Sequence, residues 1–132
     1  MATEIERDDL CFCCGKANTR GLRMTIGYPE PGAAETSLVI PEWFSGWRGI
    51  THGGFLSTVL DEIMAHACVS ASARAMTGEL AIRYLKPVPV GTRVRVVGSV
   101  KETRGRIMGT EGKVYDESGA VVAEASARFI RR

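Results

Sequence analysis

The sequence has no long apolar run. No stretch of about eighteen consecutive apolar residues occurs in its 132 residues, so no membrane-spanning helix is expected. It also lacks the basic start and apolar segment of a secretory signal, because residues Met1–Asp9 are mostly polar and acidic. We therefore expect a cytoplasmic protein that does not bind a membrane.

A strong excess of charge of either sign is also missing. Lysine and arginine number 17, aspartate and glutamate number 15, and the formal net charge is +2. The basic residues are spread along the chain rather than gathered in one segment, apart from Arg131–Arg132. Such a weak and dispersed charge does not favour nucleic acid as a partner.

Histidine is scarce, and this limits the metal sites that the chain could build. The sequence has two histidines, His52 and His66, and its four cysteines are Cys11, Cys13, Cys14 and Cys68. The spacing from Cys11 to Cys14 is half of a zinc site, but there is no second cysteine pair. We expect no metal and, in a reducing compartment, no disulfide framework. The cysteines are then small apolar packing residues in a docked amino-terminal segment.

Internal repeats, linkers and low-complexity segments are absent as well. A chain of 132 residues fits one domain and buries roughly two thirds of its unfolded surface. We expect residues 1–10 to be a flexible lead-in and residues 11–132 to form the domain.

What the sequence does contain is one long helical pattern, from Gly53 to Ser70. Apolar residues recur there at spacings of three and four and share one wide face: Phe55, Leu56, Val59, Leu60, Ile63, Met64 and Ala67. Thr51 and the pair Gly53–Gly54 mark the start of the helix. Asp61 lies mid-helix beside the apolar face, on the side that also carries Ser57, Thr58 and Glu62. A carboxylate in this position is either solvated or placed there for a purpose.

Alternating apolar and polar residues predict about six strands, at residues 22–28, 34–40, 79–86, 93–103, 106–115 and 120–130. The first two are expected to form a hairpin, and short turns between the last three favour antiparallel neighbours. Gly98 suggests a bulge or a close approach. Because so apolar a helix must be covered, the economical fold is α+β, with a curved antiparallel sheet wrapped around one central helix. Residues 41–50 form a loop whose aromatic residues anchor on the core or line a pocket: Trp43, Phe44 and Trp47.

Several short motifs carry a family resemblance. They are His52-Gly53-Gly54, the acidic Asp61, Arg83-Tyr84-Leu85-Lys86-Pro87, Cys11-Phe12-x-Cys14-Gly15, and Asn18-x-x-Gly21-Leu22. Together they resemble the hotdog-fold acyl-CoA thioesterases, especially the PaaI-like branch, over about residues 11–130. The resemblance implies a helix wrapped by a curved sheet, two subunits that pair their sheets edge to edge, active sites at the subunit interface, and no metal or other cofactor.

The resemblance also implies roles for single residues. Thioester hydrolysis needs hydrogen-bond donors for the carbonyl oxygen and a base or nucleophile for the carbonyl carbon. The Gly53 N–H matches the family's oxyanion donor, and Asp61 matches its general base or nucleophile. A helix start presents unpaired N–H groups, and neither Gly53 nor Gly54 has a side chain that would keep an acyl group away. His52 is a structural or capping residue, or alternatively a general base.

The spacing of the two principal residues predicts an oligomer. Gly53 and Asp61 are eight residues apart, which is roughly 12 Å along a helix, so both cannot touch one carbonyl group within one chain. Antiparallel helices related by a two-fold axis would bring Gly53 of one subunit near Asp61 of the other. We expect a homodimer with composite sites, and leave open whether dimers pair into a tetramer.

The chain also departs from the family pattern. Many relatives have Asn or Gln in the loop before His-Gly-Gly, where this chain has Gly46, Trp47 and Arg48. Asn18 or Thr77 could supply that polar contact, and Thr77 matches a hydroxyl position in some relatives. Candidates for binding the CoA phosphates are Arg83, Lys86, Arg104 and Arg106. Three further helix residues are expected to have no catalytic role. Glu62 is expected at the surface or an interface, His66 packed or at an interface, and Cys68 without a base to activate it.

Three functions remain open. The first is an acyl-CoA thioesterase for an aromatic or medium-chain acyl group, given the aromatic loop. The second is a non-catalytic acyl-CoA-binding domain of the same fold, which the missing loop amide allows. The third is a hotdog dehydratase or hydratase, which the His-Gly-Gly pattern matches less well because that chemistry usually needs a histidine with a carboxylate.

Overall fold

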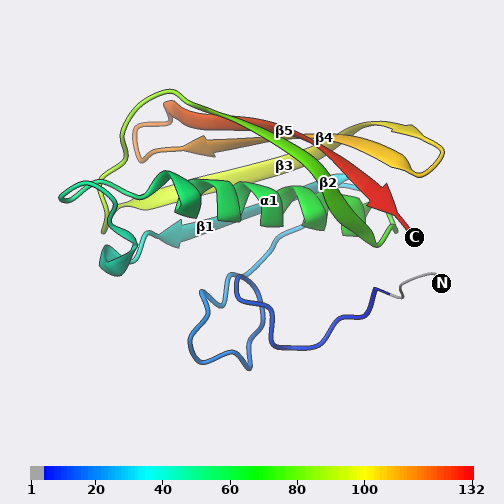
Figure 1. Cartoon of the computed structure of the whole chain (residues 1–132), viewed down its shortest axis with the longest axis horizontal. Coiled ribbons are helices and arrows are strands. Elements are labelled where there is room, and N and C mark those ends of the chain that lie inside the picture. Colours follow the sequence, from blue (N-terminus) through cyan, green and yellow to red (C-terminus); the bar gives the residue numbers. More distant parts are fainter. Residues whose placement is uncertain (1–4) are drawn as a thin grey trace.

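One long helix lies in the concave face of a curved sheet (Figure 1). A computed structural model describes residues 5–132 and contains the helix α1 (Gly53–Ser70) and a short 3-10 turn η1 (Glu42–Phe44). The strands are β1 (Ala33–Val39), β2 (Ala75–Tyr84), β3 (Arg93–Arg104), β4 (Ile107–Tyr115) and β5 (Val121–Arg131). The expected α+β fold, with one helix wrapped by an antiparallel sheet, is confirmed, although the sheet has five strands rather than about six. Among residues 5–132, no helix combines the length and hydrophobicity that a membrane crossing requires.

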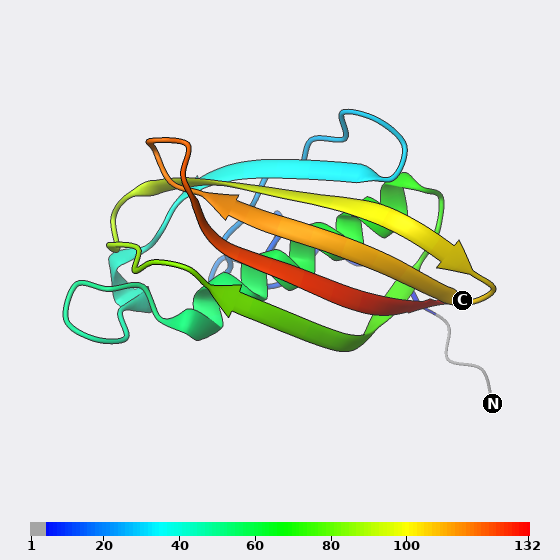
Figure 2. The ribbon, with the colours of Figure 1, turned by 90° about the horizontal axis from the view of Figure 1, so that it is seen from above.

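The strands form one sheet in the order β1-β3-β4-β5-β2, with every neighbouring pair antiparallel (Figure 2). The expected turns at Gly105 and at Asp116–Gly119 join β3 to β4 and β4 to β5, and both Gly105 and Gly119 have positive φ angles. β2 therefore forms one edge of the sheet and β1 the other.

Close contact between α1 and the sheet depends on small residues in the strands. Ala123, Ala125 and Ala127 are buried under the helix. A side chain at Gly98 would place its Cβ 2.9 Å from the backbone oxygen of Ile63, so Gly98 marks a close approach. The irregularity in β3 falls instead between Val100 and Glu102. The helix face that was predicted to be apolar fills the space between the elements and is buried.

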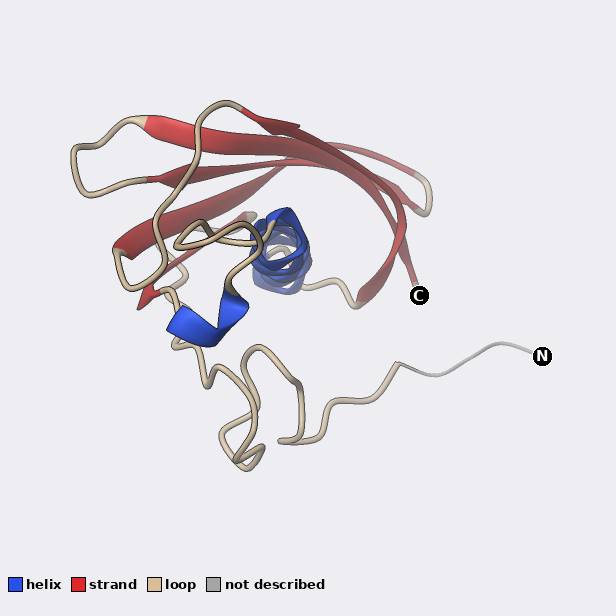
Figure 3. Cartoon of the chain, turned by 60° about the vertical axis from the view of Figure 1, so that its left-hand side comes forward, coloured by secondary structure: helices blue, strands red, loops and turns tan. Residues whose placement is uncertain are grey.

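The strand predicted at residues 22–28 is wrong. The amino-terminal loop lies on the side of α1 away from the sheet (Figure 3). Residues 22–28 lead from this loop to the edge of β1, where Gly27 forms a bridge to Glu35. Arg23 has a left-handed φ of 49°, and the Met24 amide donates a 2.8 Å hydrogen bond to Cys13 O in the amino-terminal loop. The alternation was a packing pattern, because Met24 is buried and Leu22 and Ile26 pack against the same core.

The start of β2 also differs from the sequence prediction. β2 begins at Ala75 rather than Glu79, and its register shifts between Thr77 and Glu79, so Gly78 lies in a bulge and not in a connection. Residues 1–4 of the predicted flexible lead-in lie outside the described residues. Ile5 O accepts a 2.9 Å hydrogen bond from Arg74 Nη1, and Asp9 Oδ1 accepts one of 2.8 Å from the Lys16 amide.

Candidate active site

The start of α1 presents one amide with no acceptor. His52 is the N-cap residue, and its Nδ1 accepts a 2.8 Å hydrogen bond from the Gly54 N–H. The Gly53 N–H donates to no acceptor within residues 5–132. Tyr84 Oη donates a 2.9 Å hydrogen bond to Gly53 O and holds the peptide from the other side. Of the two glycine N–H groups at the helix start, only that of Gly53 is therefore available to donate to a ligand at the positive end of the helix.

A pocket opens beside this amide. It is lined by Gly46, Trp47, Thr51, His52 and Gly53. In the sequence, Thr51 marks only the start of the helix. Its hydroxyl is buried without a hydrogen-bond partner in the described part of the chain, and this signal exists only in three dimensions.

The aromatic loop before α1 divides between the two roles expected of it. Phe44 anchors the loop, with its ring centroid 4.3 Å from that of Phe55. Trp43 stacks on Phe44 and is 66% exposed. Trp47 is 86% exposed and lines the pocket beside Gly53. Trp47 is therefore the member of the loop that is positioned to contact a ligand.

Asp61 and Thr77 meet on the other half of the helix. Thr77 lies at the bulge of β2, and its Oγ1 donates a 2.6 Å hydrogen bond to Asp61 Oδ1. The Asp61 side chain is half-buried. The contact leaves Asp61 Oδ2 to accept a proton or to attack a carbon, which is what a base or a nucleophile needs.

Gly53 and Asp61 are not brought together within one chain. They lie eight residues apart on one uninterrupted α-helix, which corresponds to roughly 12 Å along its axis. One chain thus holds an amide donor and a carboxylate that are too far apart for one carbonyl group.

Asn18 lies in the amino-terminal loop, and both ends of its amide are used there. Its Nδ2 donates to Leu10 O, and its Oδ1 accepts from the Arg20 amide, each over 3.0 Å. These bonds hold the turn of the amino-terminal loop.

The four basic candidates form two separate pairs. Arg83 and Lys86 lie at the end of the sheet near the start of α1, where they approach Glu124 (3.9 Å) and Asp116 (3.2 Å). Arg104 and Arg106 lie at the β3–β4 turn, at the opposite end of the sheet (Figure 2). Arg83 and Arg104 are 77% and 84% exposed, so their surface ion pairs are weak and leave both guanidinium groups accessible.

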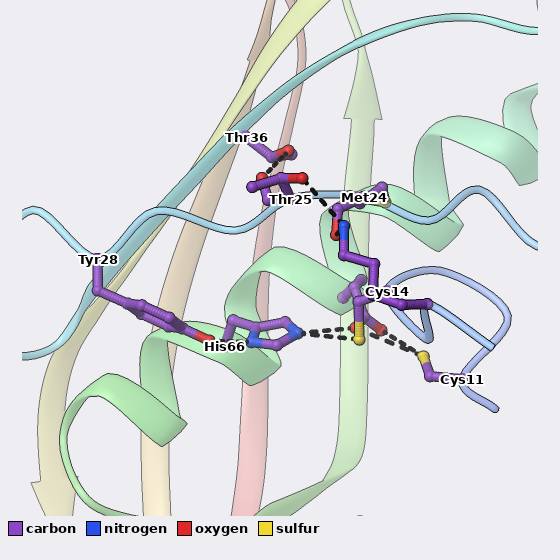
Figure 4. A network of polar contacts seen from close by, with 9 residues as sticks. Cys11, Cys14, Met24, Thr25, Tyr28, Thr36 and His66 are labelled. Atoms are coloured by element: carbon purple, nitrogen blue, oxygen red, sulfur yellow. Dashed lines mark hydrogen bonds and ion pairs between the residues drawn. The ribbon is translucent and has the colours of Figure 1, made fainter. Parts of the chain in front are cut away.

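Glu62 lies beside two of the cysteines, which depart from their expected role. Glu62 was expected at the surface or at an interface, and within this chain its side chain is only 16% exposed and contacts the amino-terminal loop. Burial alone would raise the pKa of Glu62, but hydrogen bonds from His66, Cys14 and Cys11 outweigh it and lower that pKa. Cys13 packs in the core as expected, whereas Cys11 and Cys14 are half-buried among polar groups (Figure 4).

Cysteine chemistry is disfavoured at this site. Burial raises the pKa of the Cys68 thiol to about 11, and its side chain lies in the core. His66 is packed, as expected. A thiol that stays protonated is a poor nucleophile, so Asp61 is the better candidate for attack.

Comparison with known proteins adds a family and a fold. A family model described as "Thioesterase superfamily" matches residues 48–131. The chain is 29% identical over 90 residues to acyl-coenzyme A thioesterase THEM4 of Xenopus laevis, an alignment that covers 67% of this chain and 40% of that protein. The chain therefore spans about two fifths of that relative's length.

Solved structures show the same architecture. A thioesterase superfamily protein matches with a TM-score of 0.87 at 21% identity, over 92% of this chain and 60% of that one. A hypothetical thioesterase protein of Streptococcus pneumoniae TIGR4, solved with coenzyme A, matches with a TM-score of 0.78 at 18% identity, over 83% and 85%. The same protein has been solved with alanine in place of an aspartate and, separately, of a threonine sixteen positions later.

Proposed function

The chain belongs to the thioesterase superfamily, and on that premise we propose that it hydrolyses the thioester of an acyl-CoA to a free acid and CoA. The observation that carries this proposal is the 2.6 Å hydrogen bond from Thr77 Oγ1 to Asp61 Oδ1. These residues are sixteen positions apart, the spacing of the aspartate and threonine that were replaced in the streptococcal protein. The coenzyme A in that protein's structure supports acyl-CoA as the class of substrate.

In the proposed reaction, Asp61 accepts a proton from water, and the resulting hydroxide attacks the thioester carbon. A C–O bond forms and the carbonyl π electrons move onto oxygen. The C–S bond then breaks, and the CoA thiolate takes the proton from Asp61. Direct attack by Asp61 gives the same products through an anhydride, which water then hydrolyses. In both routes the Thr77 hydroxyl orients the carboxylate.

The developing oxyanion is stabilised by the Gly53 N–H. Support comes from the position of this amide at the start of α1 and from its lack of an acceptor within residues 5–132. Donors already aimed at the developing charge need no reorganisation during the reaction. The neighbouring Gly54 N–H is occupied by His52, so His52 acts here by fixing the helix start.

The two halves of the site come from two subunits. The outer edge of β2 has no strand neighbour within the described chain. Thr77 lies on this strand, and Asp61 of α1 is hydrogen-bonded to it. Pairing two β2 edges around a two-fold axis makes the helices antiparallel. Gly53 of one subunit then faces Asp61 of the partner subunit, which resolves the roughly 12 Å separation within one chain.

The pocket and the basic residues suggest the substrate. Trp47 beside Gly53 provides an aromatic wall for an aromatic or medium-chain acyl group. Arg83 and Lys86 lie near the same end of the sheet and are candidates for binding the CoA phosphates. In an antiparallel dimer, Arg104 and Arg106 of the partner subunit come toward that end.

A non-catalytic acyl-CoA-binding domain is the second candidate. The specific observation in its favour is the loop before α1, which offers no Asn or Gln side chain to the pocket. A dehydratase is less well supported, because Nδ1 of His52 is engaged by the Gly54 amide rather than by a carboxylate.

The experiment is release of free CoA thiol from aromatic and straight-chain acyl-CoAs by wild type, Asp61→Asn and the matched control Glu79→Gln. Glu79 is an exposed acid on the same strand as Thr77. We expect turnover by wild type and the control, and a loss of about a hundredfold or more in Asp61→Asn. Saturable binding without turnover by wild type would favour the binding domain. Equal turnover by wild type and Asp61→Asn would remove Asp61 from the mechanism.

A further inference from the structure

Four potential metal ligands converge where the amino-terminal loop meets α1. Cys11 Sγ lies 3.6 and 3.7 Å from the two carboxylate oxygens of Glu62. His66 Nε2 lies 3.4 Å from Cys14 Sγ and 2.9 Å from Glu62 Oε1. Cys11, Cys14 and Glu62 each offer a ligand atom within 4.8 Å of the others. Figure 4 shows the Cys14 sulfur between His66 and Cys11.

We propose that Cys11, Cys14, Glu62 and His66 form a four-ligand zinc site. Two thiolates, an imidazole and a carboxylate are ligand types that Zn²⁺ accepts in tetrahedral sites. The sequence argued against a closed site because it contains only one cysteine pair. The fold supplies the missing half from successive turns of α1, where residues 62 and 66 share a face.

The distances fit this ion. With Zn–S near 2.3 Å and Zn–N or Zn–O near 2.1 Å, tetrahedral geometry places a sulfur about 3.6 Å from a nitrogen or oxygen ligand. The observed Cys11–Glu62 and Cys14–His66 separations are within about 0.2 Å of that value. Two separations must change when an ion binds. The 2.9 Å contact between His66 and Glu62 opens by about 0.5 Å. His66 also moves toward Cys11, because the ligand atoms that lie within 4.8 Å of one another are those of Cys11, Cys14 and Glu62.

The residues around the cluster hold it in a shape suited to a metal. Tyr28 Oη lies 2.7 Å from His66 Nδ1 and can accept a hydrogen bond from the Nδ1–H, which leaves Nε2 to bind the ion. The Gly15 amide donates a 2.9 Å hydrogen bond to Cys11 O, and a Cβ on Gly15 would lie 2.4 Å from Cys11 N. Glycine is therefore required at the turn that brings the two cysteines together.

The cluster is also accessible. All four residues line one pocket, whose wall is completed by the segment from Ile5 to Asp8 and by residues of α1 and β2. An ion can enter through this pocket without opening the core. Because thiolates are the coordinating form, binding releases two thiol protons to solvent.

The site is structural in this proposal, because four protein ligands close it. It fastens the amino-terminal loop to α1 at Glu62, the residue after Asp61, and it takes no part in thioester hydrolysis. Its test is therefore independent of whether the protein is a thioesterase.

The test is zinc content, measured by elemental analysis on the full chain purified under reducing conditions, together with the visible absorption of protein reloaded with Co²⁺. Wild type is compared with four variants: the double variant Cys11→Ser/Cys14→Ser, Glu62→Gln, Tyr28→Phe and Cys13→Ala. Cys13→Ala is the matched control because it removes a thiol of the same loop that packs in the core instead.

We expect one zinc per chain and thiolate-to-cobalt absorption in wild type and in Cys13→Ala, and neither in the double variant. Tyr28→Phe is expected to weaken zinc binding about tenfold or more in a chelator competition. Wild type that retains no zinc and shows no thiolate-to-cobalt band would overturn the proposal. So would zinc retention by the double variant, or a wild type that holds Cys11 and Cys14 as a disulfide and fails to bind metal after reduction.

Discussion

Thr77 Oγ1 donates a 2.6 Å hydrogen bond to Asp61 Oδ1, and this contact joins the bulge of β2 to the middle of α1. It uses one oxygen of the carboxylate and leaves the other free to act. Thr77 directly precedes Gly78, at the point where the register of β2 shifts. This relationship is the structural basis of the proposed base, and it is directly testable.

Removing the Thr77 hydroxyl should lower turnover without weakening substrate binding. A hydrogen bond to a charged group is worth about 1.5–3 kcal/mol, so we expect Thr77→Ala to reduce kcat by roughly 10–100-fold with little change in KM. Thr77→Ser keeps the donor and should retain most of the activity. Steady-state kinetics on one acyl-CoA measures both, and a Thr77→Ala variant with wild-type kcat would contradict the role.

Trp47 should set the preference for the acyl group. Because its side chain is 86% exposed, it buries little in the folded chain, and Trp47→Ala should leave Tm unchanged. We expect KM for aromatic and medium-chain acyl-CoAs to rise about tenfold, while acetyl-CoA is affected by less than about twofold. Trp43→Ala is the control, since Trp43 stacks on Phe44 outside the pocket. Equal effects of both variants on every substrate would argue against a pocket wall at Trp47.

Gly98→Ala should destabilise the fold by overpacking. The new Cβ would lie 2.9 Å from the backbone oxygen of Ile63, which cannot move without shifting α1. We expect the free energy of unfolding to fall by about 1–3 kcal/mol. In Gly109→Ala the new Cβ would meet only the exposed, flexible Glu102 side chain at 3.1 Å, and the loss should be smaller. Urea denaturation of the two variants side by side makes the comparison.

Asp116 should contribute stability that depends on pH. Hydrogen bonds from the Ser118 hydroxyl and the Ala120 amide, with Lys86 nearby, lower its pKa from 3.8 to about 2. Because the folded pKa lies below the unfolded one, the contribution is full above about pH 4 and is lost as pH falls toward 2. Asp116→Asn should therefore lower Tm at pH 7, and its Tm difference from wild type should shrink as pH falls from 4 toward 2. A Tm difference that is constant over this range would contradict the assignment.

Much of the fold could be predicted from local patterns. The helix over Gly53–Ser70 was predicted correctly because its apolar period and its glycine start agree. The strand at residues 22–28 was predicted incorrectly. An alternation of apolar and polar residues shows that every second side chain is buried, but it does not show that the segment pairs with a strand. Met24 achieves that burial against the far side of the helix.

Features of the site that depend on positions along one helix could be predicted from the sequence. Features that depend on burial by a segment distant in the sequence could not. The positions of Gly53 and Asp61 follow from one helix. The burial of Glu62 depends on a loop about fifty residues earlier in the sequence folding over it, which no local pattern reports. The orphaned hydroxyl of Thr51 likewise appears only once its surroundings are known.

In the proposed dimer, Gly53 of one subunit and Asp61 of the partner subunit act on the same thioester. This arrangement is tested by a mixed dimer of Asp61→Asn and Gly53→Val chains, isolated with two different affinity tags after each parent has been shown to fold by thermal melting. Valine at 53 would displace the peptide that carries the amide donor, since even a Cβ there lies 3.3 Å from the Tyr84 ring that holds this peptide. We predict that both parent dimers are nearly inactive, whereas the mixed dimer has one intact site of two and about half of the wild-type kcat. A mixed dimer as inactive as its parents would contradict the composite site.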